Sequence, residues 1–456
     1  MLKGKSVPGI IPVFGKIKNY HLRGAFYMLL YIVICITPLF IAMAYTDLPA
    51  RGFWMELSVA LGFVGLTMLS LQFLLTARYR RITGPYGIDV ILEFHRYISL
   101  VAIGFIIVHP LILFIKNSEN LRLLLFWEAP LRAQMAVLAT VSLILLAVLS
   151  LYRKQLNIKY ETWKISHGIL AVIALIGALG HVLGVGYYLA LPWKQFFWGG
   201  MFMATLSLLF YIRIGKPLQL IKRVYIVDEV IPEKGKCWTL VFRPDGHSGM
   251  KFRPGQFVWL TLGNSPFAIE DHPFSLSSSA ERRDKVAVTI KELGDFTSTI
   301  KYVKPGMPAY LEGPHGAFVP NRHYEAKSFV FIVGGVGITP VMSMLRTFAD
   351  IKFQRNILLI YANNTIEDIT FYEELEELKK KLDLTVVHVL TTPPEGWEGE
   401  TGFVTPDLLD RHFPEDKEQR MYFLCGPPVM MNAVERALLK VKVPYENIEQ
   451  EEFNLV

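Results

Sequence analysis

The sequence predicts a multidomain membrane protein, in which a six-helix transmembrane bundle precedes a small antiparallel β-barrel and a doubly wound α/β domain. Two features of the composition carry this prediction. Apolar residues make up 52% of the 456 residues and charged residues only 19%, which is more apolar than an ordinary soluble protein. Residues 1–215 hold 19 Lys and Arg against 7 Asp and Glu, whereas residues 216–456 hold 28 against 33. This distribution favours a basic membrane part followed by an acidic soluble part, and argues against a nucleic-acid binder.

Six long runs without charge predict six membrane spans, because each can cross a hydrocarbon core of about 30 Å at about 1.5 Å per residue. The first run is full length and no small-residue cleavage site follows it, so we interpret it as an anchor. With residues 1–24 in the cytoplasm, five of the 19 basic residues fall outside and 14 inside, in agreement with the positive-inside rule. We therefore expect a plasma (inner) membrane protein with both termini cytoplasmic and a lipid-embedded bundle over residues 25–215. The runs lie near residues 25–45, 57–75, 97–115, 133–152, 165–191 and 197–212.

Beyond Pro217 the apolar segments become short, rich in β-forming residues and separated by Pro and Gly turns, which predicts an antiparallel β-barrel over residues 216–324. From about residue 327 buried-type strands alternate with helices, which predicts the doubly wound domain over residues 325–456. The three cysteines show no CxxC spacing, so disulfide scaffolds, covalent haem and iron–sulfur centres are disfavoured. The expected strands are residues 223–230, 237–242, 257–262 and 285–290 in the barrel, and 328–333, 357–361, 385–390 and 420–424, with a helix at 371–381, in the second domain.

Four histidines belong to only two of the six spans: His95 and His109 to the third, His167 and His181 to the fifth. Both pairs are 14 residues apart, within about 40° of four whole helical turns and about 21 Å along the axis. Each helix therefore turns two imidazoles to one face, and His95 is level with His167 as His109 is with His181. This ladder predicts two stacked bis-histidine b-type haems, an inner and an outer one. A proton relay or structural hydrogen bonds remain alternatives, whereas zinc is disfavoured because each level offers only two ligands.

Residues near the histidines permit two interpretations each. Gly177 and Ala171 either let a flat macrocycle approach the backbone or allow close helix packing. Arg122, Arg132 and Lys194 either neutralise haem propionates and attract anionic chelates or act as interfacial anchors.

Three segments of the barrel suit a flavin. A Ser hydroxyl after an aromatic residue, in the run His-Pro-Phe-Ser-Leu-Ser at residues 272–277, can bond the edge of an isoalloxazine. Residues 291–297 are expected to open a helix whose free amides and Thr hydroxyl suit a pyrophosphate, and residues 312–318 close the barrel. Any one of these segments could be an ordinary turn, but their order and spacing favour FAD. The candidate FAD-binding residues are His272, Pro273, Phe274, Ser275, Leu276, Ser277, Lys291, Gly294, Phe296 and Thr297.

Two turns of the last domain suit a nicotinamide nucleotide. The strand at residues 329–333 leads into Gly-Gly-Val-Gly-Ile-Thr-Pro and then a helix, where amides and the helix dipole favour a diphosphate. The run Cys-Gly-Pro-Pro from Cys425 follows another strand at the carboxyl edge of the sheet. Alternatively, Cys425 is only a small buried thiol. The candidate NAD(P)H-binding residues are Gly334, Gly335, Val336, Gly337, Thr339, Pro340, Asn363, Cys425, Gly426, Pro427 and Pro428.

With these motifs, residues 25–456 resemble the NADPH oxidase and ferric reductase family. The resemblance implies that the strand at 272–275, with Ser in place of Thr, holds FAD, and that the turns at 334–340 and at Cys425 embrace the nucleotide. It also implies that an aromatic residue near the C-terminus, matched by Phe453, shields the flavin, although residues 454–456 extend beyond it. Cys425 and Phe453 are therefore the expected catalytic residues.

The resemblance implies electron transfer from cytosolic NADPH or NADH through FAD and two haems to an acceptor outside. The outer segments are short, so dioxygen or a small ferric chelate is expected as the acceptor. The run at 361–365 supplies no Arg for a 2′-phosphate, which favours NADH or dual use. Two other hypotheses stay open: an electron-donor module for a separate redox partner protein, and a proton or ion pathway with the dehydrogenase as a sensor. The oligomeric state, including a homo-oligomer, is also open.

Overall fold

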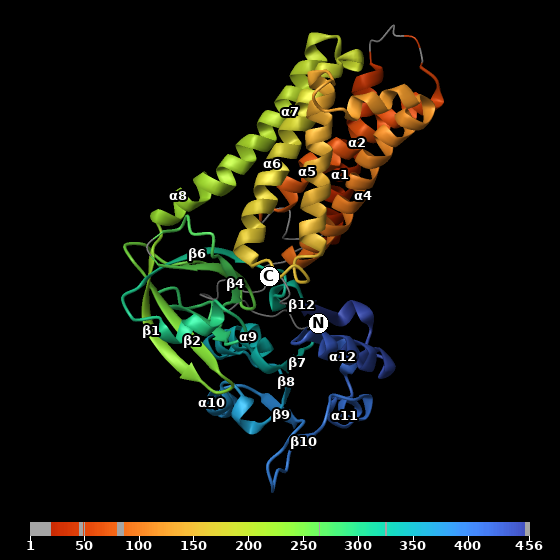
Figure 1. Cartoon of the computed structure of the whole chain (residues 1–456). Coiled ribbons are helices and arrows are strands. Elements are labelled where there is room, and N and C mark those ends of the chain that lie inside the picture. The colour runs from red at the N-terminus through yellow and green to blue at the C-terminus, as the bar shows by residue number, and fades with distance from the viewer. Residues whose placement is uncertain are drawn as a thin grey trace, which may run out of the picture. The chain divides into compact units, whose positions relative to one another are not determined.

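A computed structural model of the chain describes residues 20–44, 49, 51–79, 86–263, 265–323 and 326–451. The chain divides into a helical unit, almost all of it within residues 20–216, and a second unit that runs from residue 217 (Figure 1). Each unit is described by itself below. Phe453, one of the two expected catalytic residues, lies outside the described residues.

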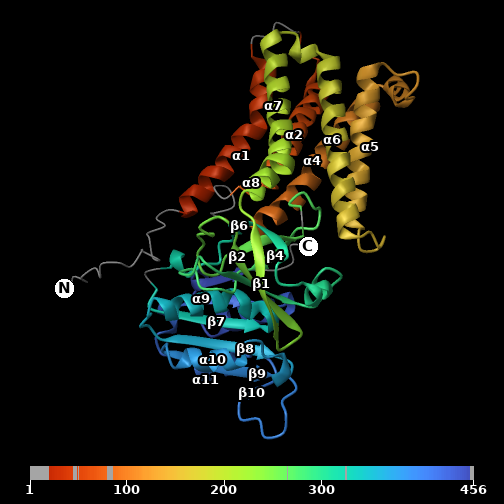
Figure 2. The same ribbon diagram turned by 90° about the vertical axis from the view of Figure 1, so that its left-hand side faces the viewer.

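The helical unit contains six helices that are long and apolar enough to cross a membrane, which confirms the predicted bundle. Figures 1 and 2 show them side by side. Large apolar side chains stay exposed along them, as expected of helices that face lipid. The sixth continues through a π-helical turn, Tyr211–Gly215, into α8, Lys216–Ile221. The six are α1 Tyr20–Met43, α2 Phe53–Leu75, α4 Ile88–Lys116, α5 Leu131–Leu151, α6 Tyr160–Val185 and α7 Pro192–Phe210.

Glycines set how closely the helices pack. A Cβ atom on Gly65 of α2 would lie 3.2 Å from the carbonyl oxygen of Ala102 on α4, and one on Gly177 of α6 would lie 2.9 Å from that of Met135 on α5. Side chains at these positions would push the helices apart. Of the two interpretations of Gly177, the structure therefore supports close helix packing.

The third helix begins at Ile88, nine residues before the apolar run that predicts it. Asp89, Glu93 and Arg96 lie before the apolar run, but they are part of the helix. Charged side chains are tolerated in the end turns of a spanning helix, where they can reach the interface. As a result His95 lies inside α4.

The second unit begins with a six-stranded antiparallel sheet in the order β4-β3-β6-β1-β2-β5. A bridge between Leu276 and Val288 joins the two edges of this sheet, so the predicted barrel is confirmed. The inner face carries an apolar core that includes Val227, Leu240 and Leu260. The strands are β1 Tyr225–Glu233, β2 Cys237–Pro244, β3 Phe257–Leu262, β4 His272–Ser275, β5 Val286–Lys291 and β6 Pro308–His315.

A parallel six-stranded sheet in the order β10-β9-β8-β7-β11-β12 completes the second unit. Separate apolar cores lie on its two faces, as in the predicted doubly wound fold. The strand order reverses between β7 and β11, and ligands of such sheets bind at that point, beyond the carboxyl ends of the strands. The strands are β7 Phe329–Gly334, β8 Ile357–Asn363, β9 Leu384–Leu390, β10 Glu400–Thr401, β11 Met421–Cys425 and β12 Ile448–Glu451; the helices are α9 Ile338–Asp350, α10 Tyr372–Lys379, α11 Pro406–His412 and α12 Pro428–Lys440.

Candidate functional site

The structure brings the four histidines of the bundle together as two pairs. The ring centroids of His95 and His167 are 6.5 Å apart, and those of His109 and His181 are 6.3 Å apart. A metal held between two imidazoles, with bonds of about 2 Å to each nitrogen, separates the ring centroids by roughly 6 Å. Both pairs therefore have the spacing of axial ligands on one central ion.

At the outer level, both histidines face backbone carbonyl oxygens with Nδ1. The Nδ1 of His109 lies 2.8 Å from the carbonyl oxygen of Ser58 and 2.9 Å from its hydroxyl, which itself donates to the carbonyl oxygen of His109. The Nδ1 of His181 lies 2.9 Å from the carbonyl oxygen of Arg132. A carbonyl oxygen can only accept, so Nδ1 must carry the proton in both rings. Each Nε2 then bears the lone pair that a metal needs.

At the inner level, side chains do the same for His95. Its Nδ1 lies 2.9 Å from Oε1 of Gln72. The amide of Gln72 is oriented by its Nε2, which donates to the carbonyl oxygen of Met68 at 2.7 Å. Oε1 therefore accepts the Nδ1 proton of His95, and Nε2 of His95 again keeps its lone pair.

His167 is held through Ser150. The hydroxyl of Ser150 donates to the carbonyl oxygen of Leu146 at 2.7 Å and receives the indole N–H of Trp163 at 3.1 Å. Since its own hydrogen is used, it accepts from Nδ1 of His167, 3.2 Å away. Within the described part of the chain, no hydrogen bond reaches Nε2 of any of the four histidines.

These residues fit a haem at each level. Metal-ligating histidines donate their second ring N–H to an acceptor that fixes the tautomer, as all four do here. Among the described residues no three His, Cys, Asp or Glu side chains converge on one point, so a bare ion would find only two protein ligands. An iron already held by a porphyrin needs only those two.

Two basic residues near the bundle ends have defined places. Lys194 is almost fully buried and its Nζ donates to the carbonyl oxygen of Ala42, 2.9 Å away, in the last turn of α1. It therefore caps a helix, which neither proposed role of Lys194 foresaw. At the inner level Nη2 of Arg213 lies 3.8 Å from the Cβ position of Gly168, the residue after His167. This guanidinium could pair with a haem propionate, and the sequence analysis missed it.

In the barrel, β4 presents Ser275 as a candidate flavin contact. Its side chain is buried, yet within the described residues its hydroxyl has no hydrogen-bond partner. A buried unpaired hydroxyl costs free energy unless a ligand completes it, so this position fits a flavin edge. On the same strand His272 stacks on Phe296, with ring centroids 4.0 Å apart, and Phe274 lies 6.1 Å from Phe296.

The next two predicted residues, Leu276 and Ser277, lie in the barrel core. Leu276 is fully buried, and its amide donates to the carbonyl oxygen of Gln256. The hydroxyl of Ser277 accepts from Thr289 at 3.1 Å and its amide donates to Ala287. The amides of Leu276 and Ser277 and the hydroxyl of Ser277 therefore form hydrogen bonds within the barrel. Within the described residues, neither side chain forms a hydrogen bond with the Ser275 hydroxyl.

The predicted pyrophosphate loop differs from its expectation. Lys291 ends β5, and the helix that follows is a six-residue 3₁₀ helix, Thr297–Tyr302. The hydroxyl of Thr297 receives the amides of Leu293 at 2.9 Å and Gly294 at 2.8 Å. A Thr hydroxyl can bond amides of its own loop, so these amides are not free as predicted.

The Gly-rich turn after β7 lies against the turn after β11. A Cβ atom on Gly337 would overlap the carbonyl oxygen of Cys425, and one on Gly334 would lie 3.1 Å from Cδ of Pro427. Gly335 has a φ of +53° and a Cβ atom there would meet nothing within 4 Å, so this turn is open on that side. No side chain caps the start of the 3₁₀ turn Gly335–Gly337 or of α9, and the amide of Ile338, the first residue of α9, donates to the carbonyl oxygens of Gly335 and Val336. A helix start without a side-chain cap, behind a Gly-rich turn, suits an anion such as a diphosphate.

The remaining members of the two turns serve this geometry. The hydroxyl of Thr339 donates to the carbonyl oxygen of Val336 at 2.8 Å, and Pro340 is buried in the first turn of α9. A Cβ atom on Gly426 would lie 3.1 Å from the backbone nitrogen of Gly334. Pro428 is the first residue of α12.

At the end of β8 the amide of Asn363 is buried, and neither of its polar atoms has a hydrogen-bond partner among the described residues. A buried unpaired amide at the carboxyl edge of the sheet fits a ligand that supplies the missing partners.

Cys425 and Glu451 face each other as register partners on β11 and β12. Both side chains are buried, and burial raises the pKa of the thiol and of the carboxyl well above their ordinary values. Burial therefore favours the protonated, neutral form of this carboxyl. The sequence analysis missed Glu451, because an acidic residue in the run Glu-Gln-Glu-Glu gives no sign of burial.

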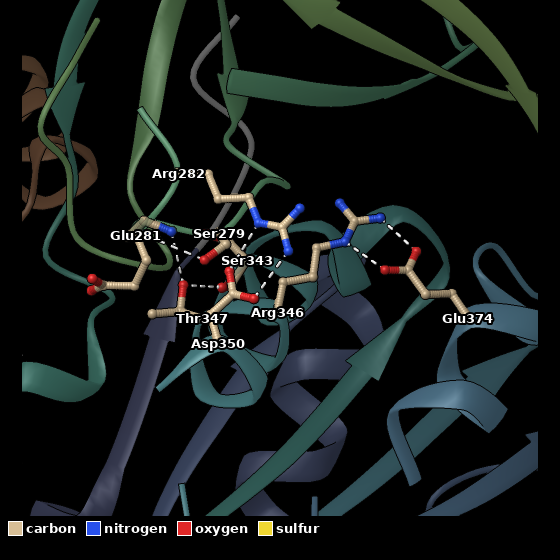
Figure 3. A network of polar contacts seen from close by, with 9 residues as sticks. Ser279, Glu281, Arg282, Ser343, Arg346, Thr347, Asp350 and Glu374 are labelled. Atoms are coloured by element: carbon tan, nitrogen blue, oxygen red, sulfur yellow. Dashed lines mark hydrogen bonds and ion pairs between the residues drawn. The ribbon is translucent and has the colours of Figure 1, made fainter. Parts of the chain in front are cut away.

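A polar network joins the strand segment after Ser275 to α9 (Figure 3). Arg346 on α9 donates from Nη1 to the carbonyl oxygen of Ser277 at 2.7 Å and forms a two-point ion pair with Glu374 at 2.8 and 2.6 Å. Ser343, one turn earlier, donates to the carbonyl oxygen of Ser278 at 2.7 Å. The network thereby fixes the helix that follows the Gly-rich turn against the flavin strand.

Three known domains match separate parts of the chain. Residues 61–178 match the ferric reductase like transmembrane component, residues 240–317 an FAD-binding domain and residues 331–436 an oxidoreductase NAD-binding domain. In this order they give the ferric reductase/NADPH oxidase-type architecture, so the resemblance expected from the motifs is confirmed.

Curated relatives match part of the chain. NADH-cytochrome b5 reductase 1 of Debaryomyces hansenii is 36% identical over 149 residues, which are 32% of this chain and 52% of the relative. The glycine betaine monooxygenase reductase subunit of Pseudomonas aeruginosa is 31% identical over 220 residues, 46% and 58% of the two chains. The chain thus spans about half the length of the curated relatives it matches. The flavohaem-like FAD/NAD-binding domain of the nitric oxide dioxygenase of Vibrio cholerae is 23% identical, with a TM-score of 0.45 over 50% of this chain and 98% of that one.

Proposed function

We propose that this chain, an oxidoreductase of the ferric reductase/NADPH oxidase-type architecture, carries electrons from cytosolic NAD(P)H through FAD and two bis-histidine haems to an acceptor on the far side of the membrane. The observation that carries the proposal is the pair of imidazole pairs, 6.5 and 6.3 Å apart, each ring with Nδ1–H engaged and Nε2 free. When bound, FAD takes two electrons as a hydride and releases them singly, and each haem carries one.

The protein's own residues would hold the two irons and set the distance between them. His95 and His167 hold the inner iron, and His109 and His181 the outer one. The 14-residue spacing on α4 and α6 separates the two levels by about 21 Å along the helix axes, which divides a hydrocarbon core of about 30 Å into short steps.

The hydrogen bonds of the histidines argue against the alternative of a proton relay. A relay needs acceptors that can take up a proton and pass it on. The Nδ1–H groups of His109 and His181 point at backbone carbonyls, and that of His95 at an amide oxygen. The hydroxyls of Ser58 and Ser150, beside His109 and His167, already donate their own hydrogens to backbone carbonyls. These oxygens hold a proton in place and do not transfer it.

The acceptor in this proposal is a small oxidant, with dioxygen first and a small ferric chelate on the same chain as the alternative. Moving an electron outward against an inside-negative potential costs about 2.3 kcal/mol per 100 mV, so a good oxidant is needed. The segments that join α1 to α2, α4 to α5 and α6 to α7 are short, namely residues 44–52, 117–130 and 186–191. Such segments suit a small molecule better than a bulky substrate, although a redox partner protein could also accept the electrons.

The donor in this proposal is NADH, or either nucleotide. The residues after β8 include Glu367, whose side chain is exposed and would repel a 2′-phosphate. Asp368 instead bonds its own turn, where its Oδ2 receives the amide of Thr365 at 3.3 Å and the hydroxyl of Thr365 at 3.2 Å.

Reconstitution in vesicles tests the proposal. Purified protein should hold two low-spin b-type haems per chain, and NADH or NADPH added to the side of the soluble domains should reduce them through FAD. Cytochrome c reduction that is sensitive to superoxide dismutase, measured on the opposite side, identifies dioxygen as the acceptor, and its replacement by ferric-citrate reduction identifies the chelate. Activity that needs an added protein identifies the donor module. A protein purified without haem contradicts the proposal as a whole.

Proteolysis of intact cells tests the location. The proposal places the chain in the plasma (inner) membrane with both termini in the cytoplasm, on the basis of the 14 basic residues inside against five outside. Protease added from outside to intact cells should then spare the second unit, and should cut it only after the membrane is opened.

A further inference from the structure

The hydrogen-bond acceptors of the two α4 histidines are regularly spaced along α2. Ser58 and Gln72 on α2 are 14 residues apart, the same spacing as His95 and His109 on α4. Because α2 and α4 run antiparallel, Ser58 meets His109 and Gln72 meets His95. One helix thus carries the acceptors of both α4 histidines, in a mirrored ladder.

The two levels differ in the kind of acceptor. At the outer level each histidine has a backbone carbonyl as acceptor, that of Ser58 or that of Arg132, and Nδ1 of His109 also lies 2.9 Å from the hydroxyl of Ser58. At the inner level both acceptors are side chains, the amide of Gln72 and the hydroxyl of Ser150. A backbone carbonyl survives any substitution of its residue, whereas a side-chain acceptor is set by the sequence.

The acceptor on Nδ1–H acts on the metal through the imidazole ring. A stronger acceptor makes Nε2 a better electron donor, and second-shell hydrogen bonds of this kind tune a metal's redox potential. A better donor favours the oxidised iron and lowers the potential.

We propose that Gln72 is a positioning residue that sets the redox potential of the inner haem through His95, whereas the potential of the outer haem depends less on side chains, because each of its histidines also has a backbone carbonyl as acceptor. This inference rests on the proposed function. Gln72 suits the role because it is buried, and because its Nε2 bond to Met68 keeps Oε1 directed at His95. Its 2.9 Å bond is also shorter than the 3.2 Å bond of Ser150 to His167, so Gln72 is the stronger of the two inner acceptors.

The experiment measures the midpoint potentials of both haems in the purified full chain, by spectroscopy at controlled potential. Gln72→Leu removes the acceptor and should raise the reduced-to-oxidised ratio of one haem about tenfold at a fixed potential, which is about 59 mV for a one-electron couple. Gln72→Glu keeps the shape but supplies a charged acceptor, and should lower the same ratio at least as much. The His109→Leu variant lacks an outer ligand and should keep only the inner haem. The haem whose potential shifts in the Gln72 variants should be this one.

Two further variants serve as controls. Gln134→Leu makes the same change on α5, where the amide donates to the carbonyl oxygen of Ala129 and not to a histidine, and should shift neither potential. Ser58→Ala removes the hydroxyl that lies 2.9 Å from Nδ1 of His109 but keeps the carbonyl acceptor at 2.8 Å, and should shift the outer potential less than Gln72→Leu shifts the inner one.

The outcomes separate the two proposals. A wild-type protein without haem contradicts the proposed function. Two haems in the wild type, with potentials that neither Gln72→Leu nor Gln72→Glu moves, contradict the role of Gln72 and leave the function intact. If Gln72→Leu binds no inner haem, the near-isosteric Gln72→Glu still decides, because a merely structural role predicts no shift in a variant with full haem content.

Discussion

The imidazole rings of His109 and His181 lie 6.3 Å apart, centroid to centroid, at an interplanar angle of 63°. The rings come from α4 and α6, and both have Nδ1 bonded to a backbone carbonyl, that of Ser58 or that of Arg132. Two rings that only filled space would have no reason to share this tautomer. The spacing is the one that two imidazole ligands of a single central atom would have.

Removal of one inner ligand tests the pairs directly. We expect His167→Ala to lower the haem content from two per chain to one, because a single imidazole does not hold the inner macrocycle. Haem is measured against FAD in the purified protein. Ser166→Ala is the matched control, since the Ser166 hydroxyl donates only to the carbonyl oxygen of Trp163; it should keep both haems. Unchanged haem content in His167→Ala would contradict the assignment of His95 and His167 as the ligands of the inner haem.

The unpaired hydroxyl of Ser275 predicts a specific loss of flavin affinity. Ser275→Ala should weaken FAD binding about tenfold, since a hydrogen bond to a bound ligand contributes roughly 1 kcal/mol or slightly more. The FAD dissociation constant is measured by fluorescence titration of the FAD-stripped chain. Ser279→Ala removes an equally buried hydroxyl that already accepts from the amide of Glu281, and should leave FAD affinity unchanged. Equal effects of both variants would mean that Ser275 acts only through packing.

The buried amide of Asn363 predicts an effect on the nucleotide alone. Asn363→Leu should raise the KM for NADH about fivefold to tenfold, because the ligand loses its buried hydrogen-bond partner, while FAD content stays the same. The control is Asn356→Leu, which stands before the first residue of the same strand at the opposite edge of the sheet and bonds Arg420. If the KM values of the two variants agree, the nucleotide does not contact Asn363.

The Arg346 network predicts a defect in the step between nucleotide and flavin. Arg346→Leu frees α9 from the flavin strand, and a misplacement of about 1 Å between reacting groups can slow a reaction roughly a hundredfold; we expect at least a tenfold slower reduction of bound FAD by NADH in stopped flow. Arg282→Leu is the control, because the side chain of Arg282, which pairs with Asp350, is 70% exposed, whereas that of Arg346 is 21% exposed. Exposed pairs contribute little, so this variant should reduce FAD at the normal rate. A normal rate in Arg346→Leu would show that the network does not align the two sites.

The histidine ladder could be predicted from the sequence because its signal lies within single helices. A spacing of 14 residues fixes the face and the rise of a helix without knowledge of the neighbours. The residues that hold the rings could not be predicted in this way. Gln72 has the same sequence appearance whether it bonds its own helix or another, and the carbonyl of Arg132 has no sequence signature at all.

The soluble part shows the same division. The apolar strands were predicted with small errors at their ends, because burial on both faces leaves a continuous apolar run. β12 was not predicted: Ile448–Glu451 is mostly polar, and it is a strand because it pairs with β11. The pyrophosphate loop was predicted with free amides, but the Thr297 hydroxyl can reach back to the amides of Leu293 and Gly294, a local competition that a residue pattern does not reveal.

A buried histidine of the nucleotide-binding domain predicts how stability depends on pH. His388 lies between the rings of Tyr361 and Tyr372, with centroids 6.0 and 5.3 Å away, and within the described residues neither of its ring nitrogens forms a hydrogen bond. Burial lowers its pKa from 6.5 to about 4. Above pH 6.5 the ring is neutral in the folded and the unfolded chain, so it adds no pH dependence.

As the pH falls from 6.5 towards 4, the unfolded chain gains a proton on His388 that the folded chain refuses, and the folded state loses stability. At about pH 5 the loss is at most roughly 2 kcal/mol. His388→Phe fills the space between the two tyrosines without titrating, so its apparent unfolding temperature should fall less between pH 7 and about pH 5 than that of the wild type. His247→Phe, which removes an imidazole already bonded to the carbonyl oxygen of Val224, controls for the loss of a histidine as such. Equal slopes for wild type and His388→Phe would mean that the folded chain accepts the proton after all, through an opening of β9 that lets water reach the ring.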